Sequence, residues 1–210
     1  MIDIPTTYRG PADGGNYEED WSNGACGIHL ITDVGRKREH NEDSCILCVP
    51  EDEVLLGRRG VLMAVADGMG GASAGEHASQ LSLTALVERY YGDAADSIPI
   101  ALEAAIKDAN RRIFDEAEAD PELQGMGTTC SAFVMHGSSG YIGQVGDSRV
   151  YVHRDSDGLV QITNDHSLVW EQQKAGIITE EEAKSHWLRN LITRAVGIKE
   201  DVEVDLFSFG

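Results

Sequence analysis

The sequence predicts an α+β fold in which helices cover the faces of antiparallel β-sheets. Strand-like segments occupy both ends of the chain, and two helical segments follow one another between them. Consecutive helices between antiparallel strands argue against an alternating strand-helix order and favour layers in which the helices cover a sheet. The sequence shows no internal repeat.

The first half of the chain contains three strand-like segments. "GIHLITDVG" begins at Gly27 and "DSCILCV" begins at Asp43, and the charged "PEDEVLLGRRG" that follows is interpreted as a turn. Residues 61–66 form a continuous apolar run, which is typical of a strand covered on both faces. Residues 1–24 are polar and rich in Gly, Asp and Glu, which predicts a poorly ordered tail before a domain over residues 25–210.

Two helices are predicted next. Apolar residues recur at helical spacing over residues 73–91, where Ser73 is a candidate N-cap. Residues 99–118 carry a second apolar stripe, and Pro99 suits the first turn of a helix.

The apolar period changes to two after the second helix. "TTCSAFVM" and "GYIGQVG" flank "HGSSG", and "RVYVHR" and "LVQIT" flank "DSDG", so both pairs predict β-hairpins. Residues 165–187 are predicted to be a polar helical insert. The last segment, "DVEVDLFSFG", predicts a strand with Val202, Val204 and Leu206 on one face.

Composition narrows the function classes. The 210 residues suffice for one sizeable core, and 36 acidic against 17 basic residues give a formal net charge of −19. This charge disfavours binding to nucleic acid or to an anionic membrane, and it fits either a protein that holds divalent cations or a soluble acidic enzyme. No apolar stretch approaches the roughly 20 residues that cross a bilayer.

The four cysteines indicate free thiols. Cys45 and Cys48 form a lone C-x-x-C in a predicted strand, where residues three apart point to opposite faces. No second pair completes a zinc site, so we expect buried free thiols and a cytoplasmic location. The N-terminus also lacks the charged-then-apolar order of a secretory signal.

The segment "VADGMGG" is the first of three acidic clusters at strand ends. Asp67 follows the buried run, where an isolated charge is costly unless a cation or hydrogen-bond donors balance it. Gly68 leaves the backbone open to a close ligand. The alternative is an ordinary turn, for which Asp-Gly is common. The glycines match neither a P-loop nor G-x-G-x-x-G, whose third glycine is replaced by Ser73.

The other two clusters are "TDVGRKREHNEDS" and "QVGDSRVYV". Adjacent acids Glu42 and Asp43 face opposite ways on a strand, and Arg38 lies upstream. Asp147 lies between apolar flanks, which suggests an inward carboxylate, although a solvated turn is the alternative. Hard oxygen ligands in this number favour Mg²⁺ or Mn²⁺ over zinc, and a pair of such ions can activate water and clamp a phosphoryl group. Arg38 could hold the phosphate oxygens in a bidentate grip.

Together, the motifs resemble those of the metal-dependent serine/threonine protein phosphatases of type 2C, in their bacterial form. The matching segments are 32–44, 65–71, 125–129 and 145–151, with 163–169 and 189–197 similar to family segments around a flap. The resemblance covers about residues 27–210. It implies a central β-sandwich of two antiparallel sheets flanked by helices, in four α-β-β-α layers.

The resemblance also implies a set of metal ligands. Asp67 would bridge two catalytic Mn²⁺ or Mg²⁺ ions. The carbonyl of Gly68 and the acids Glu42 and Asp43 would serve the second ion, directly or through water. Asp147 would contribute to a third ion under the flap.

The implied reaction is hydrolysis of phosphoserine and phosphothreonine in proteins by metal-activated water, without a phosphoenzyme. Arg38 would grip the substrate phosphate, and residues 165–187 would form the flap. Met69 cannot protonate the leaving group, so His40, His77 and His166 become candidate proton donors, of which His166, in the expected flap, is the first to test. A metal-bound water is the alternative donor. The implied partners are phosphoproteins made by a serine/threonine kinase, and we expect a monomer that binds neither nucleic acid nor a membrane.

One departure concerns the C-terminus. The family pattern continues with an apolar strand into an Asp-Gly and later an Asp-Asn, whose aspartates complete the first metal. We therefore expect a C-terminally truncated domain that lacks its last strands and a helix, with weak or no hydrolysis of p-nitrophenyl phosphate. The alternative is a truncated or catalytically inactive phosphatase-like module that binds phosphoproteins or other partners.

Overall fold

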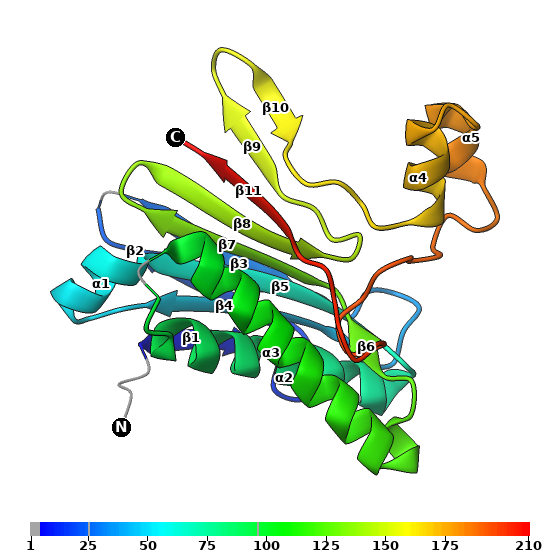
Figure 1. Cartoon of the computed structure of the whole chain (residues 1–210), viewed down its shortest axis with the longest axis horizontal. Coiled ribbons are helices and arrows are strands. Elements are labelled where there is room, and N and C mark those ends of the chain that lie inside the picture. The colour runs from blue at the N-terminus through cyan, green and yellow to red at the C-terminus, as the bar shows by residue number, and fades with distance from the viewer. Residues whose placement is uncertain (1–4, 25, 96) are drawn as a thin grey trace.

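The computed structural model describes residues 5–24, 26–95 and 97–210 (Figure 1). Its elements, in chain order, are β1 (Thr6–Gly10), β2 (Tyr17–Ser22), β3 (Gly27–Thr32), β4 (Asp43–Val49), α1 (Glu53–Arg59), β5 (Val61–Met69), α2 (Ala72–Gly92), α3 (Ile98–Ala119), the 3₁₀ helix Pro121–Leu123, β6 (Gly127–Thr128), β7 (Cys130–His136), β8 (Ser139–Val145), β9 (Tyr151–Arg154), β10 (Gly158–Gln161), α4 (Leu168–Lys174), α5 (Glu180–Ser185) and β11 (Asp205–Phe209).

A seven-stranded antiparallel sheet forms the centre of the fold. Its strand order is β1-β4-β5-β7-β8-β11, and β6 pairs with the end of β5. The predicted hairpins appear as β7–β8 and β9–β10, the second of which forms a separate two-stranded sheet. β5 continues past the apolar run because Gly68 and Met69 pair with β6. This central sheet with its flanking helices confirms the predicted α+β class.

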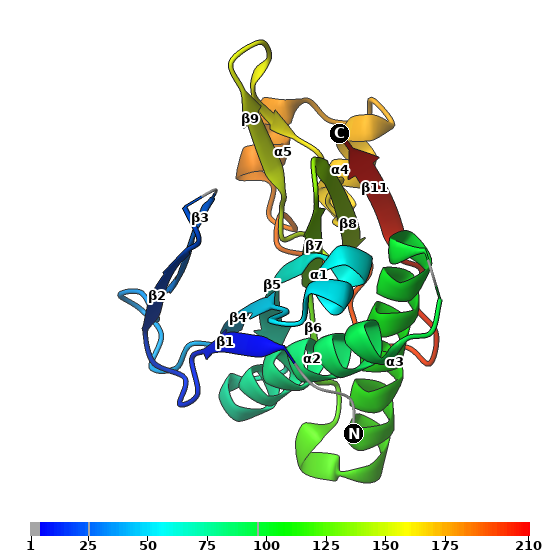
Figure 2. The same ribbon diagram turned by 90° about the vertical axis from the view of Figure 1, so that its left-hand side faces the viewer.

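Helices α2 and α3 pack together over one face of the sheet (Figure 2). The predicted apolar stripe of α3 is buried, and Pro99 lies in its first turn as expected. Gly143 on β8 lets α3 approach closely, since a Cβ there would lie 2.6 Å from Ile106 Cδ1. α2 begins after Gly71 rather than at Ser73, so the predicted side-chain N-cap is wrong. Each large apolar side chain buried here contributes about 1.5–3 kcal/mol relative to exposure.

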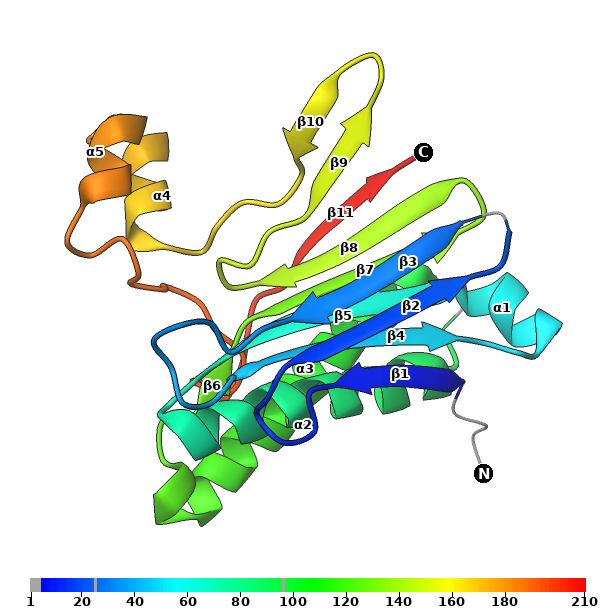
Figure 3. The same ribbon diagram turned by 180° about the vertical axis from the view of Figure 1, so that it is seen from behind.

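The β2–β3 hairpin covers the opposite face of the sheet (Figure 3). Leu30 of β3 and Cys45 of β4 are buried in one cluster, against which Tyr17 and Trp21 of β2 pack. The expectation of a poorly ordered tail over residues 1–24 is therefore wrong for residues 5–24, while residues 1–4 lie outside the described residues. Glu19 occupies the half-buried position between Tyr17 and Trp21 and so interrupts the alternating pattern of β2.

The β2–β3 hairpin is a small separate sheet that packs face to face against the central sheet. Among the described residues no helix lies over its outer face, so this chain does not itself form the fourth layer of the expected α-β-β-α arrangement (Figures 2 and 3). On the hairpin side of the central sheet, Val65 remains 44% exposed, so the expectation of a strand buried on both faces is wrong at this residue.

Two smaller expectations are also corrected. Residues 53–59, predicted to be a turn, form α1, whose N-cap Asp52 accepts a hydrogen bond from the Leu55 N–H at 2.7 Å. Short polar helices of this kind lack an apolar period and depend on their caps. At the C-terminus the strand begins at Asp205, so Val202 and Val204 precede it.

The cysteines are free, as predicted. Cys45 faces the hairpin and Cys48 faces the helices, which confirms that the C-x-x-C pair points to opposite sides of the sheet. Burial raises the pKa of the Cys48 thiol to about 11. In the part of the chain that the structure describes, no helix has the length and apolar character needed to span a membrane.

The close contact between α3 and β8 generates a stability prediction. Gly143→Ala adds a methyl group 2.6 Å from Ile106 Cδ1, so we expect it to lower the free energy of unfolding by about 1–3 kcal/mol. The control is Gly27→Ala on β3, where a Cβ meets nothing within 4 Å. Urea midpoints measure both variants, and equal midpoints would contradict the packing argument.

Candidate active site

Two carboxylates face each other where β4 begins and β5 ends. Asp43 and Asp67 are direct cross-strand partners in the antiparallel register. Side chains of such partners lie on one face with Cβ atoms about 4.5–5.5 Å apart. Alternation along β5 places Asp67 on the same face as Met63, which packs under the hairpin. Both carboxylates line a cavity of about 200 Å³ between the sheet and β3, together with Ile31, Thr32, Ser44, Cys45, Val65, Ala66 and Ser148.

Burial and neighbouring carboxylates together perturb Asp67 in this cavity. Burial, and then the charge and hydrogen bonding of Asp43, raise the pKa of Asp67 to about 6. Asp147 and Glu42 raise it further, so three other predicted site carboxylates act on Asp67. Like charges gathered in this way favour protonation of one member unless a cation balances them.

Glu42 and Gly68 are placed together by close backbone packing. The N–H of Gly68 donates to the carbonyl of Glu42 at 3.1 Å, and a Cβ on Gly68 would lie 2.0 Å from the carbonyl oxygen of Gly75 in the first turn of α2. A Cβ on Gly75 would in turn lie 2.5 Å from Glu42 Oε2. Both glycines are therefore required for the helix start and the Glu42 carboxylate to reach the end of β5.

Arg38 lies at the rim of this region. Its side chain is exposed, and Nη1 is 3.4 Å from Glu42 Oε1. An exposed pair at this distance contributes little to stability. The Arg38 guanidinium can therefore leave Glu42 and bind another anion with little loss of interaction free energy.

A polar bridge connects Asp67 to the segment that carries Asp147. The N–H of Asp67 donates to Thr129 Oγ1 at 2.9 Å, and Thr129 Oγ1 lies 2.8 Å from Ser148 Oγ. The buried side chain of Gln144 donates to the Ser148 carbonyl at 2.7 Å. The sequence analysis did not predict roles for Thr129, Gln144 and Ser148. Gln144 is a polar residue within an otherwise apolar strand, and this position could have indicated a buried hydrogen-bonding role.

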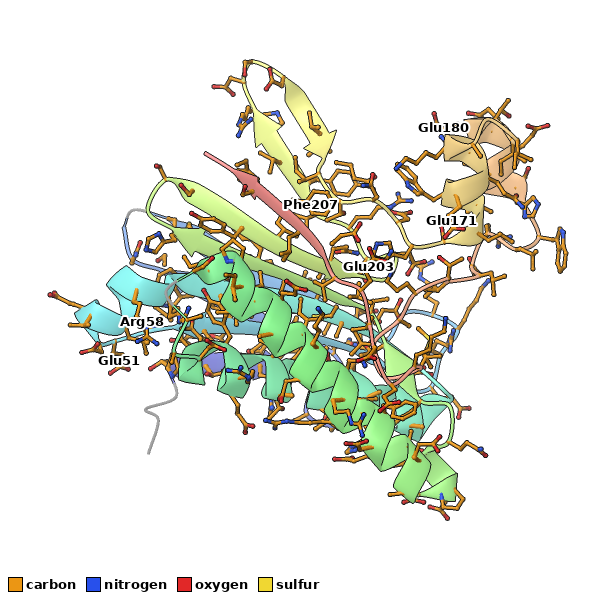
Figure 4. The ribbon with its side chains drawn as sticks, in the orientation of Figure 1. Glu51, Arg58, Glu171, Glu180, Glu203 and Phe207 are labelled. Carbon is orange, nitrogen blue, oxygen red and sulfur yellow. The ribbon has the colours of Figure 1, made fainter. Side chains whose placement is uncertain are left out.

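The flap joins the site on the Asp147 side. Arg149 forms a bidentate pair with Asp165, in which Nε donates to Oδ1 at 2.9 Å and Nη2 donates to Oδ2 at 2.5 Å. Both residues line a cavity of about 490 Å³ with Asp147 and residues of α4 and α5. Burial raises the pKa of Asp147, and Asp165 adds to this, while its own backbone N–H, Arg149 and His166 oppose it. Glu171 of α4 accepts a hydrogen bond from Thr193 Oγ1 at 2.7 Å, which ties the flap to the returning chain (Figure 4).

His166 lies inside the protein, with 6% of its surface exposed. The N–H of Gly146 donates to its Nδ1 at 3.0 Å, and its Nε2 lies 3.2 Å from Asp205 Oδ2. Both ring nitrogens are thus engaged by the protein itself. This geometry does not favour the expected role of proton donor.

The carboxylates of the site form a loosely gathered set of oxygen donors. Within residues 5–24, 26–95 and 97–210, no three His, Cys, Asp or Glu side chains gather tightly enough to hold a metal as they stand. The carboxylates are nevertheless close enough for Asp43, Asp147 and Glu42 to shift the pKa of Asp67. An all-oxygen set whose members repel one another is suited to Mn²⁺ or Mg²⁺.

Together, the fold and the site define an α+β protein with interacting carboxylates at the strand ends of an antiparallel sheet. Residues 35–204 match the family model described as protein phosphatase 2C. The chain therefore belongs to the protein phosphatase 2C family and is by family a protein serine/threonine phosphatase, which confirms the resemblance found in its motifs.

Named relatives agree with this family. The chain is 38% identical over 180 residues to the serine/threonine phosphatase Stp of Listeria innocua, covering 84% of this chain and 69% of the relative. It is 41% identical over 166 residues to PstP of Mycobacterium tuberculosis, covering 79% of this chain and 32% of that protein.

Solved structures show the same fold. Stp1 of Staphylococcus aureus superposes with a TM-score of 0.74 at 36% identity, covering 84% of this chain and 68% of the other. The catalytic domain of PstP in complex with two manganese ions superposes with a TM-score of 0.67 at 32% identity, covering 97% and 72%.

The raised pKa of Asp67 generates a pH prediction for the protein in chelator. Because the folded-state pKa of about 6 exceeds the unfolded value of about 4, the stabilising contribution of protonated Asp67 is complete below pH 4 and lost as the pH rises through 6. The Asp67→Asn variant has no carboxylate at this position, so its stability does not fall as the pH rises through 6. We expect the variant to gain stability relative to the wild type between about pH 4 and pH 7.

Urea midpoints across this pH range in EDTA measure the effect. The control is Asp155→Asn, an exposed residue in the β9–β10 turn. Parallel pH profiles for the wild type and Asp67→Asn would show that the carboxylates do not interact as the structure indicates.

Proposed function

We propose that this chain removes phosphate from phosphoserine and phosphothreonine in proteins, using Mn²⁺ or Mg²⁺ held by the carboxylates of its sheet. The observation that carries the proposal is the direct pairing of Asp43 with Asp67 and the mutual repulsion that raises the pKa of Asp67. The two manganese ions in the related PstP catalytic domain support the choice of metal.

In this proposal, Asp67 would be shared by two ions. Asp43, Glu42 and the carbonyl of Gly68 would help to hold the second ion, and Asp147 would help to hold a third beside the proposed flap. Support comes from the charges of Asp43, Asp147 and Glu42, all of which act on Asp67. When bound, the ions would supply Lewis acidity that lowers the pKa of water and neutralises phosphoryl charge.

Arg38 is proposed to bind the phosphate of the substrate. Its guanidinium is planar and carries donors that match two phosphate oxygens. In the structure this group is exposed and holds Glu42 only at 3.4 Å, so little interaction is lost when a phosphate arrives. Arg38 would then orient the phosphoryl group toward the carboxylate pair.

The surroundings of the site complete the proposal. We assign the phosphatase domain to include β1 and β2, since both pack on the central sheet, and residues 165–187 to the flap.

The substrates are proposed to be proteins phosphorylated by a serine/threonine kinase, and the protein is proposed to be a monomer. A cytoplasmic location is supported by the free thiols of Cys45, Cys48 and Cys130.

Manganese binding and phosphate release test the proposal together. We expect titration calorimetry to show Mn²⁺ binding that Asp67→Asn weakens by about tenfold or more, because it removes the charge shared by two ions. We expect Mn²⁺ to support phosphate release from a phosphothreonine peptide, and Asp67→Asn to lower that rate at least about 100-fold.

Asp155→Asn serves again as the matched control and is expected to bind and turn over like the wild type. Mn²⁺ binding that is indifferent to Asp67→Asn would refute the ligand assignment. Tight binding with no phosphate release from any phosphopeptide would instead favour a binding module over an enzyme.

A further inference from the structure

His166 holds both polar groups of Gly146, the residue before Asp147. The Gly146 N–H donates to His166 Nδ1 at 3.0 Å, and the Gly146 carbonyl accepts from the backbone N–H of His166 at 3.0 Å. Gly146 comes directly after β8 ends and lies beyond the last paired residue of the β7–β8 ladder, Val145. The side chain that accepts this N–H is almost fully buried.

The conformation of Gly146 leaves little freedom for an alternative. Its φ of 104° is a value that residues with a Cβ rarely adopt, and a Cβ would lie 2.5 Å from Thr129 Cγ2. Thr129 in turn carries the bridge to the Asp67 backbone. The peptide that leads into Asp147 is therefore fixed between Thr129 on one side and His166 on the other.

The ring of His166 is itself held at both nitrogens. Nδ1 accepts the Gly146 N–H and therefore carries no proton, while Nε2 lies 3.2 Å from Asp205 Oδ2 and 3.1 Å from Arg194 Nη1. Arg194 Nη1 donates to the other oxygen of Asp205 at 2.6 Å and so secures that carboxylate. Arg194 also pairs with Glu203 at 3.2 Å, in the segment before β11 (Figure 4).

We propose that His166 is a positioning residue, whose ring acceptor Nδ1 fixes Gly146 and thereby sets the position of the Asp147 carboxylate for cation binding. This inference rests on the proposed function, since it assigns Asp147 to the metal site. It replaces the expected role of proton donor, because Gly146, Asp205 and Arg194 engage both ring nitrogens.

Three substitutions of His166 distinguish the contribution of Nδ1 from that of Nε2. In His166→Asn the amide oxygen can occupy the place of Nδ1 and accept the Gly146 N–H, while the Asp205 contact is lost. In His166→Gln the amide reaches the place of Nε2 and keeps the Asp205 contact, while the Gly146 acceptor is lost. His166→Ala loses both, and His153→Ala, at an exposed position on β9, is the control.

Mn²⁺ affinity by titration calorimetry is the first measurement, on the full chain. We expect His166→Ala and His166→Gln to weaken binding by about tenfold, as substitutions behind metal ligands do, and His166→Asn to restore it to within about twofold of the wild type. Equal affinity in all three variants would overturn the inference. So would an equal loss in all three, since that would indicate only a need for a buried ring.

Amide hydrogen exchange at Gly146, measured by NMR without metal, is the second measurement. We expect faster exchange in His166→Ala and His166→Gln and wild-type protection in His166→Asn. If the wild type binds no Mn²⁺, the proposed metal site fails while this exchange pattern still shows that Nδ1 fixes Gly146. Identical exchange in the three variants would overturn the inference whatever the metal result.

Discussion

The repulsion between Asp43 and Asp67 is the constraint on which the site depends, and the register of the sheet imposes it. The same antiparallel pairing that sets Ile46 opposite Ala64, both buried toward the helices, sets Asp43 opposite Asp67. A slip of one residue would move the apolar residues to the hairpin face and the carboxylates into the helical layer. The register that buries the apolar core therefore also places Asp43 opposite Asp67. The free energy gained by burying the core offsets the unfavourable interaction between these two carboxylates.

Close backbone packing adds the remaining acids to this pair. Gly68 and Gly75 let the start of α2 lie against the end of β5, and Glu42 fits there because neither residue has a side chain. Thr129 joins the Asp67 backbone to the segment that carries Asp147. Acids from three distant parts of the sequence are thus brought together by short hydrogen bonds and by glycines rather than by direct ion pairs.

The sequence could predict the elements whose apolar period is strong and could not predict those whose period is hidden. The hairpin of β7 and β8, the two long helices and the opposite orientations of Cys45 and Cys48 follow from local patterning. β2 was missed because the acidic Glu19 stands at one of its half-buried positions, and α1 was missed because it depends on the cap at Asp52. Local pattern carries no information about these polar contacts.

The same limit applies to the site. The motifs predicted that Asp43, Asp67 and Asp147 converge, since each follows or opens an apolar strand. The bridge through Thr129 and the clamp of His166 on Gly146 connect residues that are far apart in sequence, and no periodicity marks them. His166 illustrates this limit. Its residue type suggested proton transfer, whereas its burial and hydrogen-bond partners indicate that it positions the Gly146 peptide.

The base of the flap and its tip differ in how firmly they are held. At the base, His166 and Thr193 share a backbone hydrogen bond of 2.8 Å, and the Leu168 N–H donates to the Leu191 carbonyl at 3.0 Å. Toward the tip, Ile177 is 70% exposed and Trp187 is 82% exposed. Segments with few buried contacts open at lower free energy than the core. The exposed part of this segment is therefore less firmly held than its base, which backbone hydrogen bonds join to the chain that carries His166 and thereby to the Asp147 peptide.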